Sequence, residues 1–404
     1  MSARAERPDG ACPCAQNALD SWESGWEWSL VVFPCLVICL LPWVSQLGAP
    51  EWLGRLAGSY NGAVSFLLVL LGWTCARRIR GREGTAGMEL LEDAAVRFLP
   101  AHLAVAGISA LAALVFRSMG LSTIGDTPAM QWLSGTANLL LVQGWFPAGV
   151  FLFFWNPHLW IAGLGLLCVQ LAVPLIRGLE WGLKNWSGPV WWLAAGLWAG
   201  SLGLVIGLLS LVPEEIVDVS GRMWLFGIFP GLRVWEFALG ALGSLAFDFP
   251  HRRGGVRELL VASAAARRAL LAAGLGWNLA VAGLGLDVLG GDRGWLLSQS
   301  FLMAPAWLAA LLAIRSGFPR FRQFLSSDAA RELAGMAWIA MLLAPWSFWA
   351  CVWMDGHGLM LWLPGLLLGF TAFTAYLLQR FWVAPMERVL PGLLEKWQRR
   401  RANR

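Results

Sequence analysis

Arg233 and Glu236 are the clearest candidates for chemistry, because both lie within an apolar stretch that runs from Phe229 to Gly240. Their spacing places them on one face of a helix, where guanidinium and carboxylate can neutralise each other. A single charge at the centre of a membrane helix costs about 2.5–3.5 kcal/mol. Two interpretations follow: an ion pair that fixes helix packing, or a pair that lines a cavity for a substrate or donor.

The segment Arg97-Phe-Leu-Pro-Ala-His102 carries a second candidate group. Pro100 suits the first turn of a helix, because its missing N–H is not needed there. Arg97 is then either an anchor that reaches lipid headgroups or a ligand for an anionic substrate. His102, about one turn inside the membrane, is either a hydrogen-bonded interfacial histidine or a general base. The remaining histidines are expected in solvated loops: His158, His251 and His357.

The composition indicates which elements must position these residues. Hydrophobic residues make up 58% of 404 and charged residues only 14%, whereas charged residues form about a quarter of an average soluble chain. Long apolar runs alternate with short basic clusters. These features predict an all-α fold, a polytopic transmembrane bundle of about ten helices. The predicted helices are 29–47, 60–76, 98–116, 159–176, 190–212, 223–247, 269–289, 296–314, 333–353 and 359–378.

The basic residues predict the orientation of these helices. With the N-terminus inside, the inner segments hold about 25 Lys and Arg residues and the outer segments four. This bias favours a multi-pass integral membrane protein with both termini cytoplasmic. It also explains the net charge of +5 without nucleic acid binding. The predicted parts are a polar N-terminal tail (1–27), a transmembrane domain (28–379) and a basic amphipathic tail on anionic lipid (380–404).

Three further features are predicted from local composition. Residues 120–157 form a long outer segment whose apolar patch, Asn138–Phe146, favours an interfacial or re-entrant piece over another crossing. The glycines of Gly200–Gly207 favour close helix packing. The cysteines have no spacing typical of a zinc site, so no metal is predicted. Cys12-Pro-Cys14 lies in the polar tail, with lipidation or metal ligation as the alternatives to a plain tail.

Six segments follow one another in a recognisable order from about residue 60 onward. They are Ala63–Trp73, Arg97-Phe-Leu-Pro100, Asn156-Pro-His-Leu-Trp160, Pro230–Gly240, Leu325-Ser-Ser327 through Pro345, and Phe381-Trp-Val-Ala-Pro385. In this order they resemble the acyltransferase-3 family of membrane acyltransferases. The match of Pro230–Gly240 to that family's Pro-x-x-Arg-x-x-Glu-Phe-x-x-Gly segment is the most specific.

The resemblance implies about ten helices and transfer of an acyl group to a hydroxyl of a carbohydrate, lipid or small metabolite. It implies acyl-CoA as the donor substrate and no tightly bound cofactor. Arg97 would contact the donor phosphates, Trp160 would belong to the substrate or donor site, and Arg233 and Glu236 would position the acceptor.

The chain also departs from the family pattern. Its first predicted helix, Trp28–Leu47, has neither the histidine regarded as the family's base nor the preceding arginine. Gly165, Ala344 and Ala384 stand near positions where the family has ionisable groups. Acyl transfer requires a deprotonated hydroxyl and a stabilised oxyanion, so His102 is the candidate replacement base.

Two hypotheses about function therefore stay open. The first is a membrane acyltransferase with a divergent site, whose partners are the bilayer and a hydroxylated acceptor. The second is a non-catalytic carrier of a lipid or glycan, or a partner subunit of another membrane protein, built on the same scaffold. The missing histidine favours the second hypothesis, and the ordered motifs favour the first.

Overall fold

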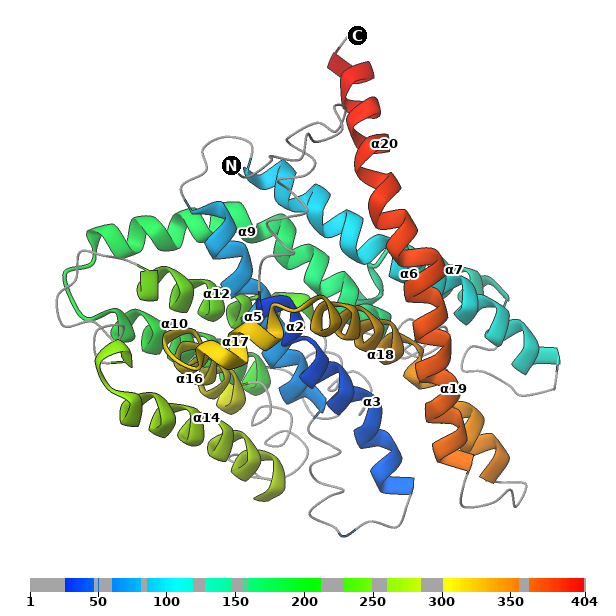
Figure 1. Ribbon diagram of the computed structural model, residues 1–404, viewed down its shortest axis with the longest axis horizontal. Helices are drawn as coiled ribbons and strands as arrows, with labels where there is room; N and C mark the ends of the chain where they lie inside the picture. Colours follow the sequence, from blue (N-terminus) through cyan, green and yellow to red (C-terminus); the bar gives the residue numbers. More distant parts are fainter. Residues whose placement is uncertain are drawn as a thin grey trace, which may run out of the picture.

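The chain is described from a computed structural model, and every element in its described residues is helical (Figure 1). The structure describes residues 26–46, 50, 60–80, 86–118, 128–146, 156, 158–211, 229–248, 260–284, 301–355 and 363–402. The predicted N-terminal tail up to residue 25, Cys12, Cys14, His251 and His357 lie outside these ranges.

The helices follow one another along the chain with bounds that overlap every predicted range. They are α2 (Trp26–Ser29), α3 (Val32–Gln46), α5 (Tyr60–Ile79), α6 (Ala86–Ser118), α7 (Pro128–Leu139), η1 (Gln143–Trp145), α9 (Leu159–Asn185), α10 (Val190–Leu211), α12 (Pro230–Asp248), α14 (Ala264–Leu284), α16 (Met303–Ser316), α17 (Pro319–Leu325), α18 (Asp328–Asp355), α19 (Leu363–Leu378), η4 (Gln379–Val383) and α20 (Ala384–Ala402).

Five helices among the described residues are long and apolar enough to cross a membrane. They are Asn61–Ile79, Gly87–Val115, Leu159–Asn185, Val190–Gly207 and Gly365–Leu394. A helix of about 20 residues spans the hydrocarbon core of a bilayer. The all-α class and the capacity to span a membrane are thus confirmed.

Helix α5 lies at the centre of the bundle and meets α12 at backbone contact. A Cβ atom added to Gly72 would overlap the carbonyl oxygen of Phe237, and one added to Gly240 would overlap that of Val69. Only glycine permits so close an approach of two helices. Helices α9, α16, α3 and α6 also pack around α5.

The prediction of close packing along Gly200–Gly207 is wrong for all three of its glycines, since Gly207 also has open space beside it among the described residues. A Cβ atom at Gly200 or Gly203 would meet no atom of the described structure within 4 Å. The hydropathy of α10 could not distinguish a helix face against protein from one that faces lipid, because lipid tails are as apolar as leucine. Close glycine contacts lie instead on α5 and α12, on α9 at Gly163 and on α14 at Gly274.

Helix α6 begins at Ala86, twelve residues before the predicted start at residue 98. Pro100 therefore lies inside the helix and not in its first turn, which corrects that expectation. A proline inside a helix leaves the carbonyl four residues earlier without its usual partner. The segment before Arg97 carries Glu89, Glu92 and Asp93. These charges lower its hydropathy, so hydropathy alone placed the start of the helix too late.

The segment after α6 returns into the bundle. His102 contacts the Leu139 carbonyl at the end of α7, and the Asn156 side chain donates to Ser109 of α6. Ser109 lies nine residues before the end of α6, or about 14 Å along the helix axis. Asn156 therefore lies well short of the Ser118 end of α6, which favours the re-entrant alternative for this segment.

The C-terminal helix α20 continues from α19 through the π-helical turn η4. In Figure 1 the red helix runs on in the line of α19 and projects beyond the other helices. A tail that lies flat on lipid headgroups would turn away from that line. The structure thus gives residues 384–402 a direction that the amphipathic pattern alone did not indicate.

Candidate functional site

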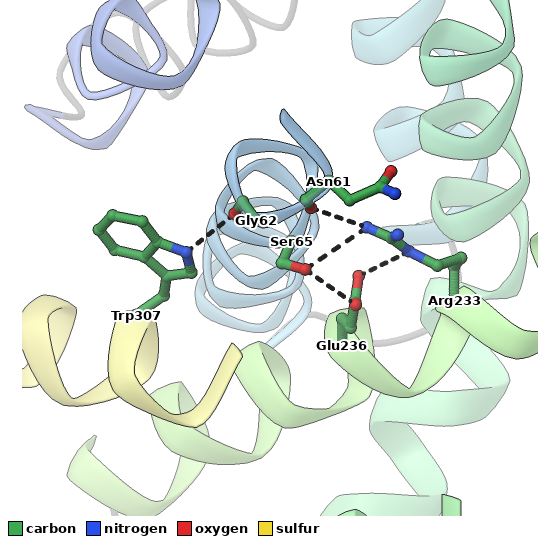
Figure 2. A network of polar contacts seen from close by, with 6 residues as sticks. All are labelled: Asn61, Gly62, Ser65, Arg233, Glu236 and Trp307. Atoms are coloured by element: carbon green, nitrogen blue, oxygen red, sulfur yellow. Dashed lines mark hydrogen bonds and ion pairs between the residues drawn. The ribbon is translucent and has the colours of Figure 1, made fainter. Parts of the chain in front are cut away.

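The Arg233–Glu236 pair lies at the start of α12 and faces α5 (Figure 2). Arg233 Nε donates to Glu236 Oε2 at 3.0 Å, and both side chains are at most 1% exposed. Ser65 Oγ donates to the other oxygen of Glu236 at 3.0 Å. Arg233 Nη2 also reaches the Asn61 carbonyl at 3.3 Å. Because the charges are paired and hydrogen-bonded, their burial is tolerated.

This pair is separated from the opposite end of α5. Arg77, near the C-terminal end of α5, forms an ion pair with Glu27 of α2. Twelve residues separate Arg77 from Ser65, or about 18 Å of helix. The pair at Arg233 therefore lies near one end of α5, while Arg77 marks the other end.

Arg97 lies at the Arg77 end of the bundle, beside a polar cavity of about 330 Å³. Its guanidinium lies over the Trp28 ring, 4.1 Å from the ring centroid, which holds its orientation by a cation–π contact. Four arginines and three carboxylates form the charged lining, an excess of positive charge. They are Arg97, Arg331, Arg380, Arg388, Asp328, Glu332 and Glu387, from α6, α18, η4 and α20.

The π-helical turn η4 places part of this lining. It sets Arg380 at the cavity, and it brings Trp382 to α6, where its indole N–H donates to the Pro100 carbonyl at 3.0 Å. The segment around Pro100 and the segment Phe381–Pro385, distant in sequence, are therefore joined by a hydrogen bond. π-Helical turns occur often at functional sites.

His102 is buried one residue beyond Ala101 of the cavity lining. Its Nε2 lies 3.2 Å from the Leu139 carbonyl oxygen. A carbonyl can only accept, so Nε2 carries the proton and Nδ1 keeps its lone pair. Nδ1 has no hydrogen-bond partner. The imidazole is thus held in a tautomer whose free nitrogen can accept a proton.

His158 is not a solvated loop residue, and that expectation was wrong. Its Nδ1 lies 2.7 Å from the Met341 carbonyl of α18. Met341 precedes Pro345 by four residues, so its carbonyl has no intrahelical donor. His158 supplies the missing N–H, and the neighbouring Asn156 donates to the Leu342 carbonyl at 2.7 Å. Trp160 follows in the first turn of α9 and is 3% exposed.

A small apolar pocket of about 60 Å³ adjoins the polar cavity. Trp28 and Trp338 line both spaces. Phe98 lies between the two indoles, with ring centroids 6.0 Å from Trp28 and 5.2 Å from Trp338. Most of the remaining wall comes from α5 and α9, including Leu71 and Gly165, and Glu27 of α2 and Val31 complete it. The three aromatic rings thus form a wall between a charged cavity and an apolar one.

The structure brings the predicted residues together only in part. Arg97 lines the polar cavity and His102 follows Ala101 of its lining without lining it, while Arg233 and Glu236 line neither the polar cavity nor the apolar pocket. Among the described residues, the predicted donor ligand Arg97 and the predicted acceptor ligands Arg233 and Glu236 therefore do not line the same cavity. No sequence pattern singled out the carboxylates and arginines of α18 and α20, because basic residues at helix ends are expected from orientation alone.

No family model matches the chain, and no curated protein or solved structure matches it.

Proposed function

We propose that the chain is a polytopic membrane acyltransferase of about ten helices. It would transfer an acyl group from acyl-CoA to a hydroxyl of a carbohydrate, lipid or small metabolite. The observation that carries the proposal is the polar cavity at Arg97, with its excess of arginines. Guanidinium groups bind phosphate through paired hydrogen bonds, and coenzyme A carries several phosphates.

In this proposal the cavity faces the cytosol, where the donor is found. Arg97, Arg331, Arg380 and Arg388 belong to the segments that the positive-inside bias assigns to the inner side. Both termini are then cytoplasmic. Arg97 serves as a ligand for the donor phosphates. Its contact with Trp28 holds the guanidinium in the same position when no donor is bound.

His102 is the proposed general base. Its unpartnered Nδ1 supports this role, since a neutral imidazole accepts a proton from a hydroxyl as that hydroxyl attacks the thioester. Arg233 and Glu236 take a structural role in this version, because their hydrogen bonds are already made within the α5–α12 contact. Trp160 supports the start of α9.

The alternative is a non-catalytic carrier or partner subunit on the same scaffold. The buried Arg233–Glu236 pair favours it, since residues that the family resemblance assigns to the acceptor are used here for packing. Such a protein would bind an anionic amphiphile at the Arg97 cavity without converting it.

The test is acyl-CoA hydrolysis or transfer by the purified chain in lipid nanodiscs. We expect His102→Ala to lower turnover by about 10²–10⁴-fold. Arg97→Ala should weaken donor binding by about ten- to a hundredfold, as loss of a charged hydrogen bond does. Arg268→Ala is the matched control, because Arg268 is exposed on α14 and bonds its own helix at Ala264. Absence of turnover together with intact binding would favour the alternative.

A further inference from the structure

Two tryptophans that line the apolar pocket, Trp28 and Trp338, carry buried indole N–H groups that the fold leaves without a partner. Trp28 and Trp338 are each 7% exposed, and neither indole N–H has a hydrogen-bond partner. A buried donor without a partner costs about 1–3 kcal/mol, so most buried donors in proteins are satisfied. Two such donors on the wall between two cavities point to an acceptor that arrives with a ligand.

We propose that this wall binds the thioester end of a short-chain acyl donor. The phosphates would lie at Arg97, the carbonyl oxygen would accept from Trp28 and Trp338, and the acyl chain would fill the apolar pocket. This inference rests on the proposed function. It adds an acyl-chain site and a limit on chain length.

The limit follows from the size of the pocket. A cavity needs about 10–15 Å³ of this volume for each water-sized group. The 60 Å³ pocket therefore holds about four or five such groups, which corresponds to a chain of about four or five carbons. Leu71 and Gly165 form part of its wall, and a Cβ atom at Gly165 would lie 3.8 Å from Leu71 Cδ2. A larger side chain at residue 165 would fill the pocket.

The first experiment measures the affinity of the full chain in nanodiscs for CoA and for acetyl-, butyryl-, octanoyl- and palmitoyl-CoA. Affinity should rise about fourfold for each added methylene up to butyryl, by transfer of apolar surface. It should then level off. An affinity that continues to rise up to palmitoyl-CoA would indicate that the acyl chain lies in the bilayer. Equal affinities for CoA and all acyl-CoAs would indicate that the pocket does not bind the acyl chain. Either result overturns the inference.

Variants of the pocket wall make the test specific. Gly165→Leu should remove the advantage of butyryl-CoA over CoA while leaving CoA affinity intact, which also shows that the variant folds. Gly196→Leu is the matched control, because a Cβ atom there would meet nothing within 4 Å. Leu71→Ala should shift the preference toward longer chains. A butyryl advantage that survives Gly165→Leu would contradict the assignment.

The indole donors are tested with a donor that lacks a carbonyl. Wild-type protein should bind butyryl-CoA up to about tenfold more tightly than the thioether butyl-CoA, as one hydrogen bond allows. Trp338→Phe should abolish this difference. Trp192→Phe, on exposed α10, should keep it. A difference unchanged in Trp338→Phe overturns the donor role.

The outcomes separate this inference from the proposed function. If CoA binds through Arg97 and acyl-CoA turns over with no dependence on chain length, only the pocket assignment fails. If neither CoA nor any acyl-CoA binds, the proposed function fails and the inference fails with it.

Discussion

The most informative residues of this chain are buried polar groups that have a defined hydrogen-bond partner. Arg233 and Glu236 show this most clearly, since Ser65 and the Asn61 carbonyl complete the hydrogen bonds that the ion pair leaves open. The i, i+3 spacing predicted the pair itself. The partners on α5 could not be predicted, because they are 168 or more residues away in the sequence and depend on which helices pack together.

At the residue scale we predict that Glu236→Gln strongly destabilises the protein. It leaves the Arg233 charge buried without its counter-ion, which typically costs about 3–5 kcal/mol. The measurement is thermal unfolding in detergent. Glu180→Gln is the matched control, since Glu180 forms an i, i+3 pair with Arg177, whose side chain is 41% exposed. Pairs at exposed sites contribute about 0–1 kcal/mol. Equal losses for both variants would show that burial does not set the effect.

At the scale of elements, prolines inside helices create backbone sites that other elements occupy. Pro345 frees the Met341 carbonyl of α18, and His158 at the start of α9 fills that position. Every range predicted from hydropathy overlaps an observed helix, whereas α7 and α17 lie outside all the predicted ranges. Helix ends were less predictable: α6 extends through charged residues, and α9 runs to Asn185, nine residues past its predicted end.

At this scale we predict a coupling between His158 and Pro345. His158→Ala should destabilise the protein by about 1–3 kcal/mol, because the Met341 carbonyl is left unpaired. In a Pro345→Ala background the backbone N–H of residue 345 can bond that carbonyl, so His158→Ala should cost much less. A double-mutant cycle of unfolding free energies measures the difference. Strict additivity of the two changes would rule out the proposed link.

At the scale of the whole molecule, the distribution of charge predicts how the bundle is oriented in the membrane. The cavity at Arg97 and the ion pair of Arg77 with Glu27 lie at one end, and the Arg233 pair lies toward the other end of α5. The sequence analysis predicted two residues of the candidate site, Arg97 and His102. It did not predict which helices surround them. The walls of the cavity come from helices that are distant in the sequence, and a local sequence pattern does not predict which helices pack together.

At this scale we predict the orientation. Arg401→Cys, near the C-terminus, should react with a membrane-impermeant maleimide only after the cells are opened, because the inner side carries the basic residues. Arg293→Cys, in a predicted outer loop, should react with intact cells. Both changes are made after Cys12 and Cys14 are replaced by serine. Labelling of Arg401→Cys in intact cells would reverse the orientation and would place the polar cavity away from cytosolic donors.

The position of Arg233 and Glu236 on a single helix also bears on biogenesis. If the two charges lay on different helices, the first helix to be synthesised would enter the lipid with an unpaired charge. It would stay unpaired until the second helix was made. Here α12 carries both charges one turn apart, so in the proposed ten-helix arrangement the segment would insert as a neutral unit before it docks on α5. The glycine contact then forms between helices already in place, as two-stage assembly of membrane proteins requires.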